Sequence, residues 1–371
     1  MQAIKSSPPE ILPAFDNELY FEAQCEAFYE RIDGTDQTDI VIEFGGKPFG
    51  DHHASRVLPG YCPDIKARVL NELQSKRDTR NIMVVNAKDI LPEQFGRTPH
   101  GRIRGDSSLR YDDETSRIII ESRETHGIEI DGVALSVTPR LVSLDALNQI
   151  RDFKQMIKQT TGLSTSIFSE LSGYPDASKI SIPTLEKDER LHHSDRPTVL
   201  MSPGGGSGKF GVAFSELFGA LSKGNNSSFA KFETFPVFNL PPDHPLNLAF
   251  EAATADLGNV VFAYEDGKTN YDKDDQNYKL IQWLADRFQA NSKHLQVSSP
   301  FDFSVNVIES GIRNHDFVAQ ACLDEIDRRI TRYMNELSHG DEKPATLERT
   351  RLLQQQCIGY LAVAKSGTSI A

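Results

Sequence analysis

The spacing of apolar residues changes repeatedly along the chain, from short continuous runs to repeats of three and four. Short runs rich in Val, Ile and Phe predict buried strands, and the longer repeats predict helices with one apolar face. The predicted strands are residues 39–44, 81–85, 133–137, 197–201, 229–235 and 260–263, with one more around Ile167. The predicted helices among them are residues 16–32, 63–73, 112–125, 144–157, 210–221, 244–256 and 277–289. This alternation predicts an α/β fold with a mostly parallel, Rossmann-like sheet and helices on both faces.

The pattern changes after residue 301, where two long, charged helix patterns at 316–334 and 345–364 follow with no further strand. They predict a helical C-terminal subdomain. The expected organisation is an α/β domain at 1–171, a second α/β domain at 172–300 and the helical subdomain at 301–371. The amphipathic faces of the two long helices also favour a homo-oligomer.

Composition narrows the class of protein. The chain has 371 residues, of which 38% are hydrophobic and 25% charged, as expected for a globular protein with more than one domain. A formal net charge of −13 argues against a nucleic-acid partner. No apolar run approaches the roughly 18 residues of a membrane span, and the N-terminus lacks the apolar core of a signal peptide. The widely spaced Cys25, Cys62, Cys322 and Cys357 suggest reduced thiols, so we expect a cytoplasmic protein.

The most informative stretch runs from residue 196 to residue 221. A predicted strand leads into a loop with four glycines at 202–209, and Phe210 and Phe214 then begin the apolar face of a helix. Strand, glycine loop and helix form the setting in which backbone N–H groups and a helix N-terminus bind phosphate. The candidate binding residues here are Gly204, Gly205, Gly206, Ser207, Gly208 and Lys209.

The match of this loop to a P-loop is partial. Gly208 and Lys209 fit, but Pro203 stands where the first glycine is expected, and Phe210 stands where Ser or Thr would bind Mg²⁺. One interpretation is a phosphate or nucleotide site with Lys209 as a point charge. The other is a glycine-rich turn with a solvated lysine.

Polar residues also follow the other predicted strands, at 45–56, 86–89 and 265–271. The carboxyl ends of parallel strands share one edge, so we expect these loops to meet the glycine loop in a single cleft. Candidates for charge stabilisation or proton transfer, beside Lys209, are Lys47, His52, Arg56, Lys231 and His244. Further candidates for binding are Asn86, Lys88 and Lys268.

Two further groups are weaker candidates. Glu43, Glu233 and Asp256 could hold Mg²⁺ in place of the missing hydroxyl. A basic loop with Arg97 and Arg102 could clamp a second anion, although such clusters are more often solvated.

Several blocks of the sequence together resemble one bacterial family. They are residues 15–24, 43–60, 86–90, 103–106, 202–209, 230–257, 267–271 and 299–306. These blocks are similar to the family known as domain of unknown function 1846. The resemblance implies an α/β architecture with additional smaller domains and a GSGK loop, here Gly206 to Lys209. It also implies that family members continue into a further C-terminal segment. It implies no particular reaction.

Two functions from different classes are compatible with these observations. The first is an enzyme that uses ATP, another nucleotide or another phosphorylated small molecule, with or without Mg²⁺, for phosphoryl transfer or ATP-dependent ligation. The alternative is a non-catalytic sensor of a phosphorylated metabolite. The missing hydroxyl at Phe210 favours the sensor, and the number of ionisable residues in the loops favours the enzyme.

Overall fold

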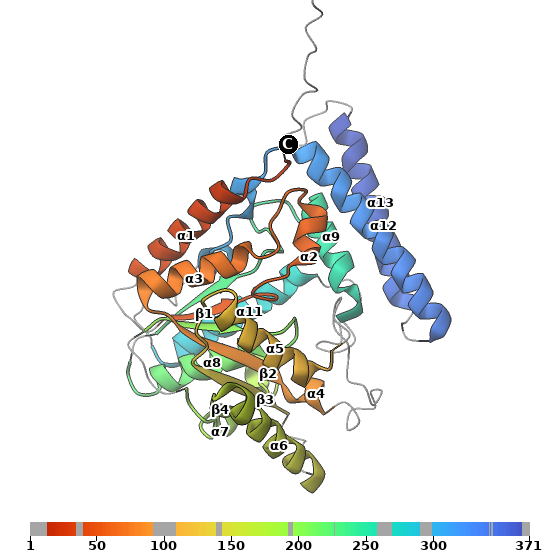
Figure 1. The fold of residues 1–371 in the computed structure, drawn as a ribbon. Helices are drawn as coiled ribbons and strands as arrows, with labels where there is room; N and C mark the ends of the chain where they lie inside the picture. The colour runs from red at the N-terminus through yellow and green to blue at the C-terminus, as the bar shows by residue number, and fades with distance from the viewer. Residues whose placement is uncertain are drawn as a thin grey trace, which may run out of the picture.

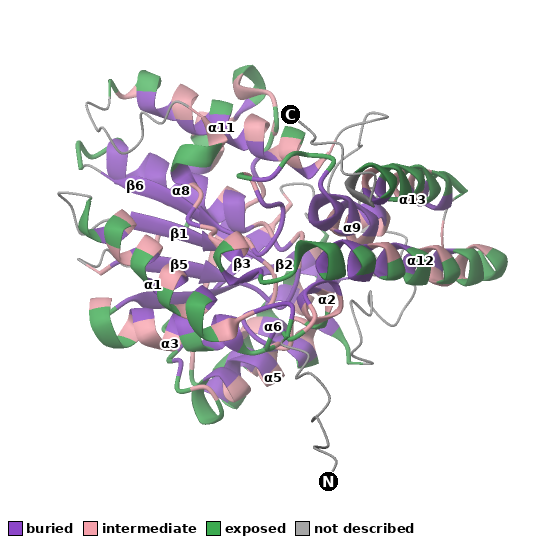
Figure 2. Cartoon of the chain, turned by 90° about the horizontal axis from the view of Figure 1, so that it is seen from above, coloured by how far each residue is buried: buried purple, intermediate pink, exposed green. Residues whose placement is uncertain are grey.

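Six parallel strands form one central sheet in the order β4-β3-β2-β5-β1-β6. Its strands are β1 Ile40–Phe44, β2 Arg80–Asn86, β3 Gly132–Val137, β4 Thr165–Ser169, β5 Thr198–Met201 and β6 Ser228–Phe232. The computed structural model describes residues 13–34, 40–91, 109–138, 143–191, 196–225, 227–257, 269–289, 299–340, 342 and 344–365. The strands are drawn almost wholly as buried in Figure 2, as expected when helices cover both faces of a parallel sheet.

Helices cover both faces of the sheet, as predicted (Figure 1). One face is covered by α1 Asn17–Asp33, α3 Ile65–Arg77, α5 Tyr111–Glu124 and α6 Leu144–Thr161, which pack around Phe28, Leu70 and Phe153. The other face is covered by α7 Ile182–Leu185, α8 Lys209–Leu221 and α11 Asn270–Arg287, with Phe214 and Leu284 in the core. The fold class predicted from the apolar pattern is therefore confirmed.

The helical C-terminal region packs against one end of this sandwich. α12 His315–His339 and α13 Pro344–Lys365 lie side by side and contact α9 Pro245–Thr254, while α2 His52–Val57 contacts α12 and α9 (Figure 1). Their shared core includes Cys322, Ile326 and Leu246, all fully buried. The remaining short elements are α4 Ala87–Ile90, η2 Ala177–Lys179, η3 Ala255–Leu257, η4 Pro300–Phe303 and η5 Ile308–Gly311.

The elements cross the boundaries between the predicted domains. β1 from the predicted first domain lies between β5 and β6 from the second, so these two segments build one sheet. Likewise α2 and α9, which precede residue 301, share a core with α12 and α13. The predicted strand at 260–263 lies outside the described residues. The helix expected at 277–289 begins earlier, at Asn270, because Thr269 and Asp272 form a capping box there.

The order of the strands creates a crevice between β2 and β5. β2 connects through α5 to β3 on one side, and β5 connects through α8 to β6 on the other. Because α5 and α8 lie on opposite faces of the sheet, the carboxyl ends of β2 and β5 stay open between them. Such a switch point is where ligands bind in open α/β sheets.

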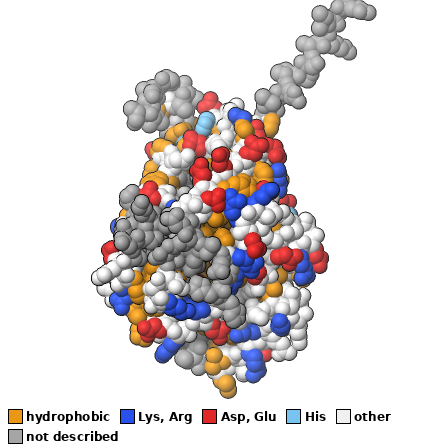
Figure 3. Space-filling model, turned by 90° about the vertical axis from the view of Figure 1, so that its left-hand side faces the viewer, with side chains coloured by type: hydrophobic (Ala, Val, Ile, Leu, Met, Phe, Trp, Pro, Cys, Tyr) orange, Lys and Arg blue, Asp and Glu red, His pale blue; other side chains and the backbone are white. Residues whose placement is uncertain are grey.

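Two surface properties bear on the partners of the protein. Within the described residues, no helix is both long and apolar enough to cross a bilayer. On the face shown in Figure 3, acidic and basic side chains are interspersed. The net charge of −13 is therefore not gathered into one continuous acidic surface on that face.

Candidate functional site

A cleft of about 1820 Å³ opens at the carboxyl edge of the sheet. It is lined by the loop after β1, including His52, by Asn86 and Lys88 after β2, and by the glycine loop after β5. His52 and Lys209 therefore border the same cavity, although they are far apart in the sequence. The predicted convergence of the strand ends is confirmed for these loops. Of the predicted exit at 265–271, Asn270 lines the cleft, and residues 265–268 lie outside the described part of the chain.

Two glycines give the glycine loop its shape. Gly206 and Gly208 have φ values of +74° and +90°, in the left-handed region that side chains disfavour. A Cβ atom at Gly208 would also lie 2.9 Å from Ser136 Oγ, so this position has no room for a side chain. Asn86 Nδ2 lies 3.5 Å from the carbonyl oxygen of Gly206, which links the loops after β2 and β5.

The glycine loop presents unpaired N–H groups at the start of α8. Gly208 is the N-cap, and the N–H of Val212 donates to its carbonyl at 3.1 Å. Within the described chain, no acceptor is found for the N–H groups of Gly206 to Gly211, and Ser207 Oγ is buried without a partner. Together with the positive end of the helix dipole, these groups favour an anion.

Lys209 is buried, although its position at the start of a helix led us to expect a solvated side chain. Only 5% of its surface is exposed, and its Nζ donates to Ser202 Oγ at 2.8 Å. Burial lowers the pKa of Lys209 to about 8, although the carboxylates of Glu43 and Glu233 partly oppose this shift. The lysine therefore changes charge close to neutral pH.

Phe210 faces the core, as its place in the apolar repeat predicted. Its ring lies 5.9 Å from that of Tyr174, 6.1 Å from Phe214 and 6.2 Å from Phe229, measured between centroids. An aromatic ring packed against three others therefore occupies the position at which a P-loop carries its metal-binding hydroxyl.

Lys231 is the cation of a buried cluster behind the cleft. It forms ion pairs with Glu233 Oε2 at 2.9 Å and with Asp274, and in the strand register of β1 and β6 it lies opposite Glu43. Burial favours the neutral amine, but Asp274 and Glu233 raise the pKa of Lys231 above its usual value. Lys231 is thus a permanent cation that positions carboxylates, and it does not line the cleft. Asp274 was not found by the sequence reasoning.

The three candidate metal ligands do not come together. Glu43 and Glu233 border the cleft beside the buried lysines, whereas Asp256 lies near Arg332, with 3.7 Å between Oδ2 and Nη2. Among the described residues, no group of three or more His, Cys, Asp or Glu could hold a metal ion. Glu43, Glu233 and Asp256 therefore do not form one metal site.

Three other candidate residues line the cleft, and each of these cations forms an ion pair with a carboxylate. Lys47 Nζ lies 3.0 Å from Glu114, Lys88 pairs with Glu170, and Arg56 Nε lies 2.8 Å from Glu325. Because each of these cations already has a carboxylate partner, its charge is partly neutralised at the cleft.

His244 and Lys268 are not brought to the cleft. His244 is buried as the N-cap of α9, its Nδ1 accepts from the N–H of Leu246 at 3.3 Å, and it does not line the cavity. Burial and His315 lower its pKa to about 4, so it stays neutral. The role assigned to His244 from the sequence is therefore replaced by a structural one. Lys268 lies outside the described residues.

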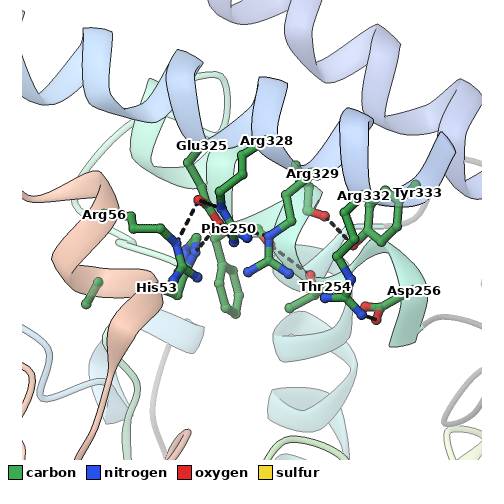
Figure 4. Close-up of polar contacts among 12 residues, drawn as sticks. His53, Arg56, Phe250, Thr254, Asp256, Glu325, Arg328, Arg329, Arg332 and Tyr333 are labelled. Carbon is green, nitrogen blue, oxygen red and sulfur yellow. Dashed lines mark hydrogen bonds and ion pairs between the residues drawn. The ribbon is translucent and has the colours of Figure 1, made fainter. Parts of the chain in front are cut away.

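The sequence reasoning missed a group of arginines on the helical side of the cleft, shown in Figure 4. Arg328, Arg329 and Arg332 on α12 join Arg56 on α2, and we call these four side chains the arginine wall. The basic loop around Arg97, for which an anion clamp was the weaker of two interpretations, lies outside the described residues. The only signal in the sequence was that three arginines of one helix share a face, at i, i+1 and i+4.

Comparison with known proteins adds relatives but no reaction. The UPF0371 protein of Streptococcus pneumoniae strain CGSP14 is 32% identical over 349 residues, covering 92% of this chain and 66% of that protein. The UPF0371 protein of Streptococcus pneumoniae serotype 4 (strain ATCC BAA-334 / TIGR4) is 33% identical over 351 residues, with the same coverage of 92% and 66%. The chain thus spans 66% of the length of these relatives.

A family model agrees with these relatives and with the sequence blocks noted above. The model described as "Domain of unknown function DUF1846, N-terminal" matches residues 13–357, which is most of the chain. The chain therefore belongs to the DUF1846 family.

Proposed function

We propose that the cleft binds a nucleotide or another phosphorylated small molecule and transfers a group from or to it, by phosphoryl transfer or by ATP-dependent ligation. The observation that carries the proposal is the position of the glycine loop. Its unpaired N–H groups and the first turn of α8 open into a cleft at the carboxyl edge of a parallel sheet. Loop amides at a helix N-terminus attract phosphate, and this edge is the usual place for a ligand.

Lys209 supplies charge that depends on the ligand. In the free protein burial holds its pKa at about 8. A phosphate nearby favours the charged ammonium and raises this pKa, so binding takes up a proton around pH 8. Phosphate affinity should therefore fall as the pH rises above 8, because the free protein then holds a neutral amine.

The ionisable groups around the loop favour turnover over simple binding. A lysine that changes charge near neutral pH can donate or accept a proton during a reaction. Lys47 and Lys88 at the rim of the cleft add positive charge that stabilises a transferring phosphoryl group. Because the three candidate carboxylates do not form one site, we assign no step to a bound metal ion.

Calorimetric titration of the full chain with ATP, ADP and inorganic phosphate, in phosphate-free buffer, tests this proposal. The variant is Lys209→Met, which keeps the length of the side chain and removes its charge. Loss of a charge-assisted contact worth roughly 1.5–3 kcal/mol should weaken phosphate binding about tenfold to a hundredfold. Lys158→Met, on the exposed surface of α6, is the matched control and should bind as the wild type does.

The results separate the proposed enzyme from the alternative. Equal affinities in wild type and Lys209→Met would exclude the glycine loop as a phosphate site. Binding that depends on Lys209 but leaves ATP intact, with a range of candidate acceptors present, would favour the sensor. The observation in favour of the sensor is that a buried phenylalanine, Phe210, stands where a P-loop has its metal-binding hydroxyl.

Self-association through the helical region also stays a proposal. α12 and α13 expose several large apolar side chains, which are Phe317, Met334, Leu352, Ile358 and Val363. Light scattering on the full chain and on Leu352→Lys/Ile358→Lys tests it. The same mass for both proteins would exclude this surface as the interface.

A further inference from the structure

Three of the four members of the arginine wall are held together by a single buried carboxylate, and Arg332 pairs with Glu336 and Asp256. Glu325, whose side chain is fully buried, accepts from the Nε atoms of Arg56 at 2.8 Å, Arg328 at 2.7 Å and Arg329 at 2.8 Å. His53 Nδ1 lies 3.3 Å from the same carboxylate (Figure 4). Glu325 therefore fixes side chains from α2 and α12 at one place on the border of the cleft.

Arg329 is the member of the wall whose hydrogen-bonding capacity is least used. Its side chain is only 9% exposed, and Glu325 is its ion-pair partner through Nε. Its two terminal amino groups have no acceptor in the part of the chain that the structure describes, and the residue borders the cleft. These amino groups are not fully shielded from solvent, so an anion in the cleft can reach them and pair with the guanidinium.

The charges around the wall point to an anion as the missing partner. The four guanidiniums form ion pairs with three carboxylates, those of Glu325, Glu336 and Asp256. Burial lowers the pKa of His53, and the hydrogen bond to Glu325 only partly opposes this, so the ring adds no charge near neutral pH. Arg329 shares its carboxylate partner, Glu325, with Arg56 and Arg328, so a single negative charge is divided among three guanidiniums.

We infer that Arg329, with Arg332 beside it, binds a second anionic group of the ligand, at the opposite wall of the cleft from the glycine loop. The natural ligand is then a phosphorylated small molecule that carries a further phosphate or carboxylate. The inference rests on the proposed function for the first group, since the glycine loop holds the phosphate. The planar fork of arginine pairs with two oxygens of either kind of anion.

Titration calorimetry with two simple anions, inorganic phosphate and malonate, tests the second subsite. We expect wild type to bind two phosphates per chain. Arg329→Gln should weaken one of them at least tenfold and leave the other unchanged, whereas Lys209→Met should weaken the other one. Malonate distinguishes the two kinds of anionic group. If it competes at the site that Arg329→Gln weakens, the subsite accepts a carboxylate as well as a phosphate; if it does not compete, the second group is a phosphate.

Two further variants separate binding from folding. Arg349→Gln removes an arginine that pairs with the buried Glu251 at 2.9 Å but does not line the cleft. It should lose a similar ion pair and keep both phosphate sites. Arg329→Lys keeps the positive charge without the fork and should bind with intermediate affinity. Melting curves of every variant show whether it is folded at the temperature of the titration.

The outcomes distinguish this inference from the proposed function. One phosphate per chain that only Lys209→Met weakens would overturn the second subsite and leave the proposed function standing. One phosphate that only Arg329→Gln weakens would support the arginine subsite and overturn the glycine loop. Two phosphates that Arg329→Gln leaves unchanged would also overturn the inference.

Discussion

The two walls of the cleft are built on different physical principles. One wall, which we call the glycine wall, is the glycine loop at residues 202–209. It takes its shape from backbone conformation and from the apolar residues under α8, such as Phe210 and Phe214. The arginine wall is shaped by ion pairs, and those of Arg56, Arg328 and Arg329 converge on the fully buried Glu325. One wall therefore depends on packing and the other on charge compensation, and each should fail under a different kind of substitution.

The difference also bears on how each wall meets an anion. The glycine wall offers N–H dipoles and a lysine whose charge depends on pH. The arginine wall offers guanidiniums, which remain charged at any pH at which the protein is folded. A ligand that spans the cleft would thus be held by one adjustable and one permanent positive charge.

Glu325→Gln is expected to have the largest effect on stability. Burial alone would raise the pKa of this carboxyl, but hydrogen bonds from His53 and Arg328 lower it well below its usual value. The substitution leaves the buried Arg329 without a counter-charge and removes a partner from the partly exposed Arg56 and Arg328, which costs about 3–5 kcal/mol in the free energy of unfolding. Denaturation by urea measures this loss. Glu336→Gln, in a partly exposed pair with Arg332, is the control and should lose less than about 1 kcal/mol.

The same carboxyl also makes stability depend on pH. Because the folded-state pKa of Glu325 is lower than its unfolded value, its contribution is complete above the ordinary value of 4.5 and is lost as the pH falls below it. Glu325→Gln should therefore show a smaller loss of stability on acidification than wild type. Parallel slopes for both proteins below pH 4.5 would contradict this account.

Phe210→Ser should disrupt the packing under the glycine wall. It empties a core position between Tyr174, Phe214 and Phe229 and should cost about 3 kcal/mol. Although the new side chain restores the P-loop sequence, its hydroxyl would face the core and should create no Mg²⁺-dependent hydrolysis of ATP. Thermal melting and a phosphate-release assay measure the two effects. Unchanged stability would show that the aromatic cluster does not support α8.

Lys209→Met should instead increase the free energy of unfolding and so stabilise the free protein. The folded-state pKa of about 8 lies below the ordinary value of 10.5, so below pH 8 the fold carries a charge that it disfavours. Removing this charge should add on the order of 2–3 kcal/mol at pH 7. Between pH 8 and 10.5 the unfolded wild type binds more protons, so wild-type stability rises and the gain from the variant shrinks. Urea unfolding at pH 7 and pH 10 in phosphate-free buffer checks both statements, and a less stable variant at pH 7 would refute them.

Lys47→Ala should have the smallest effect. The side chain of Lys47 is 25% exposed, and its partner Glu114 keeps an ion pair with Arg117 at 2.8 Å. A partly exposed pair of this kind contributes less than about 1 kcal/mol. The midpoint of urea unfolding should therefore stay close to that of wild type, while phosphate affinity decreases because a cation at the rim is lost. A large destabilisation would place Lys47 among the residues that hold the fold.

The glycine wall could be predicted from the sequence because its signals are local. The strand, the glycines and the apolar face of α8 follow one another within 26 residues, 196–221, and parallel strand ends share an edge whatever the rest of the fold. Burial of Lys209 could not be predicted, because it depends on Ser202, Glu43 and Glu233 in three different strand exits.

The arginine wall could not be predicted because its partners are distant in the sequence. Glu325 pairs with Arg56 across 269 positions and with His53 across 272. In the sequence, Arg328 and Arg329 are indistinguishable from the solvated charges of any amphipathic helix. His244 was misjudged for the converse reason, since a histidine at a helix start can be an N-cap as well as a catalytic residue.

The place of β1 in the sheet also has a consequence for synthesis of the chain. β1 ends at Phe44, but its two neighbours, β5 and β6, end only at Met201 and Phe232. At about 5–20 residues per second, a ribosome needs roughly 8–30 seconds to make the 157 residues from Phe44 to Met201. During that time the apolar run of β1 has both edges unpaired, which is the state in which strands aggregate. A chaperone that shields the nascent N-terminal region should therefore raise the yield of folded protein.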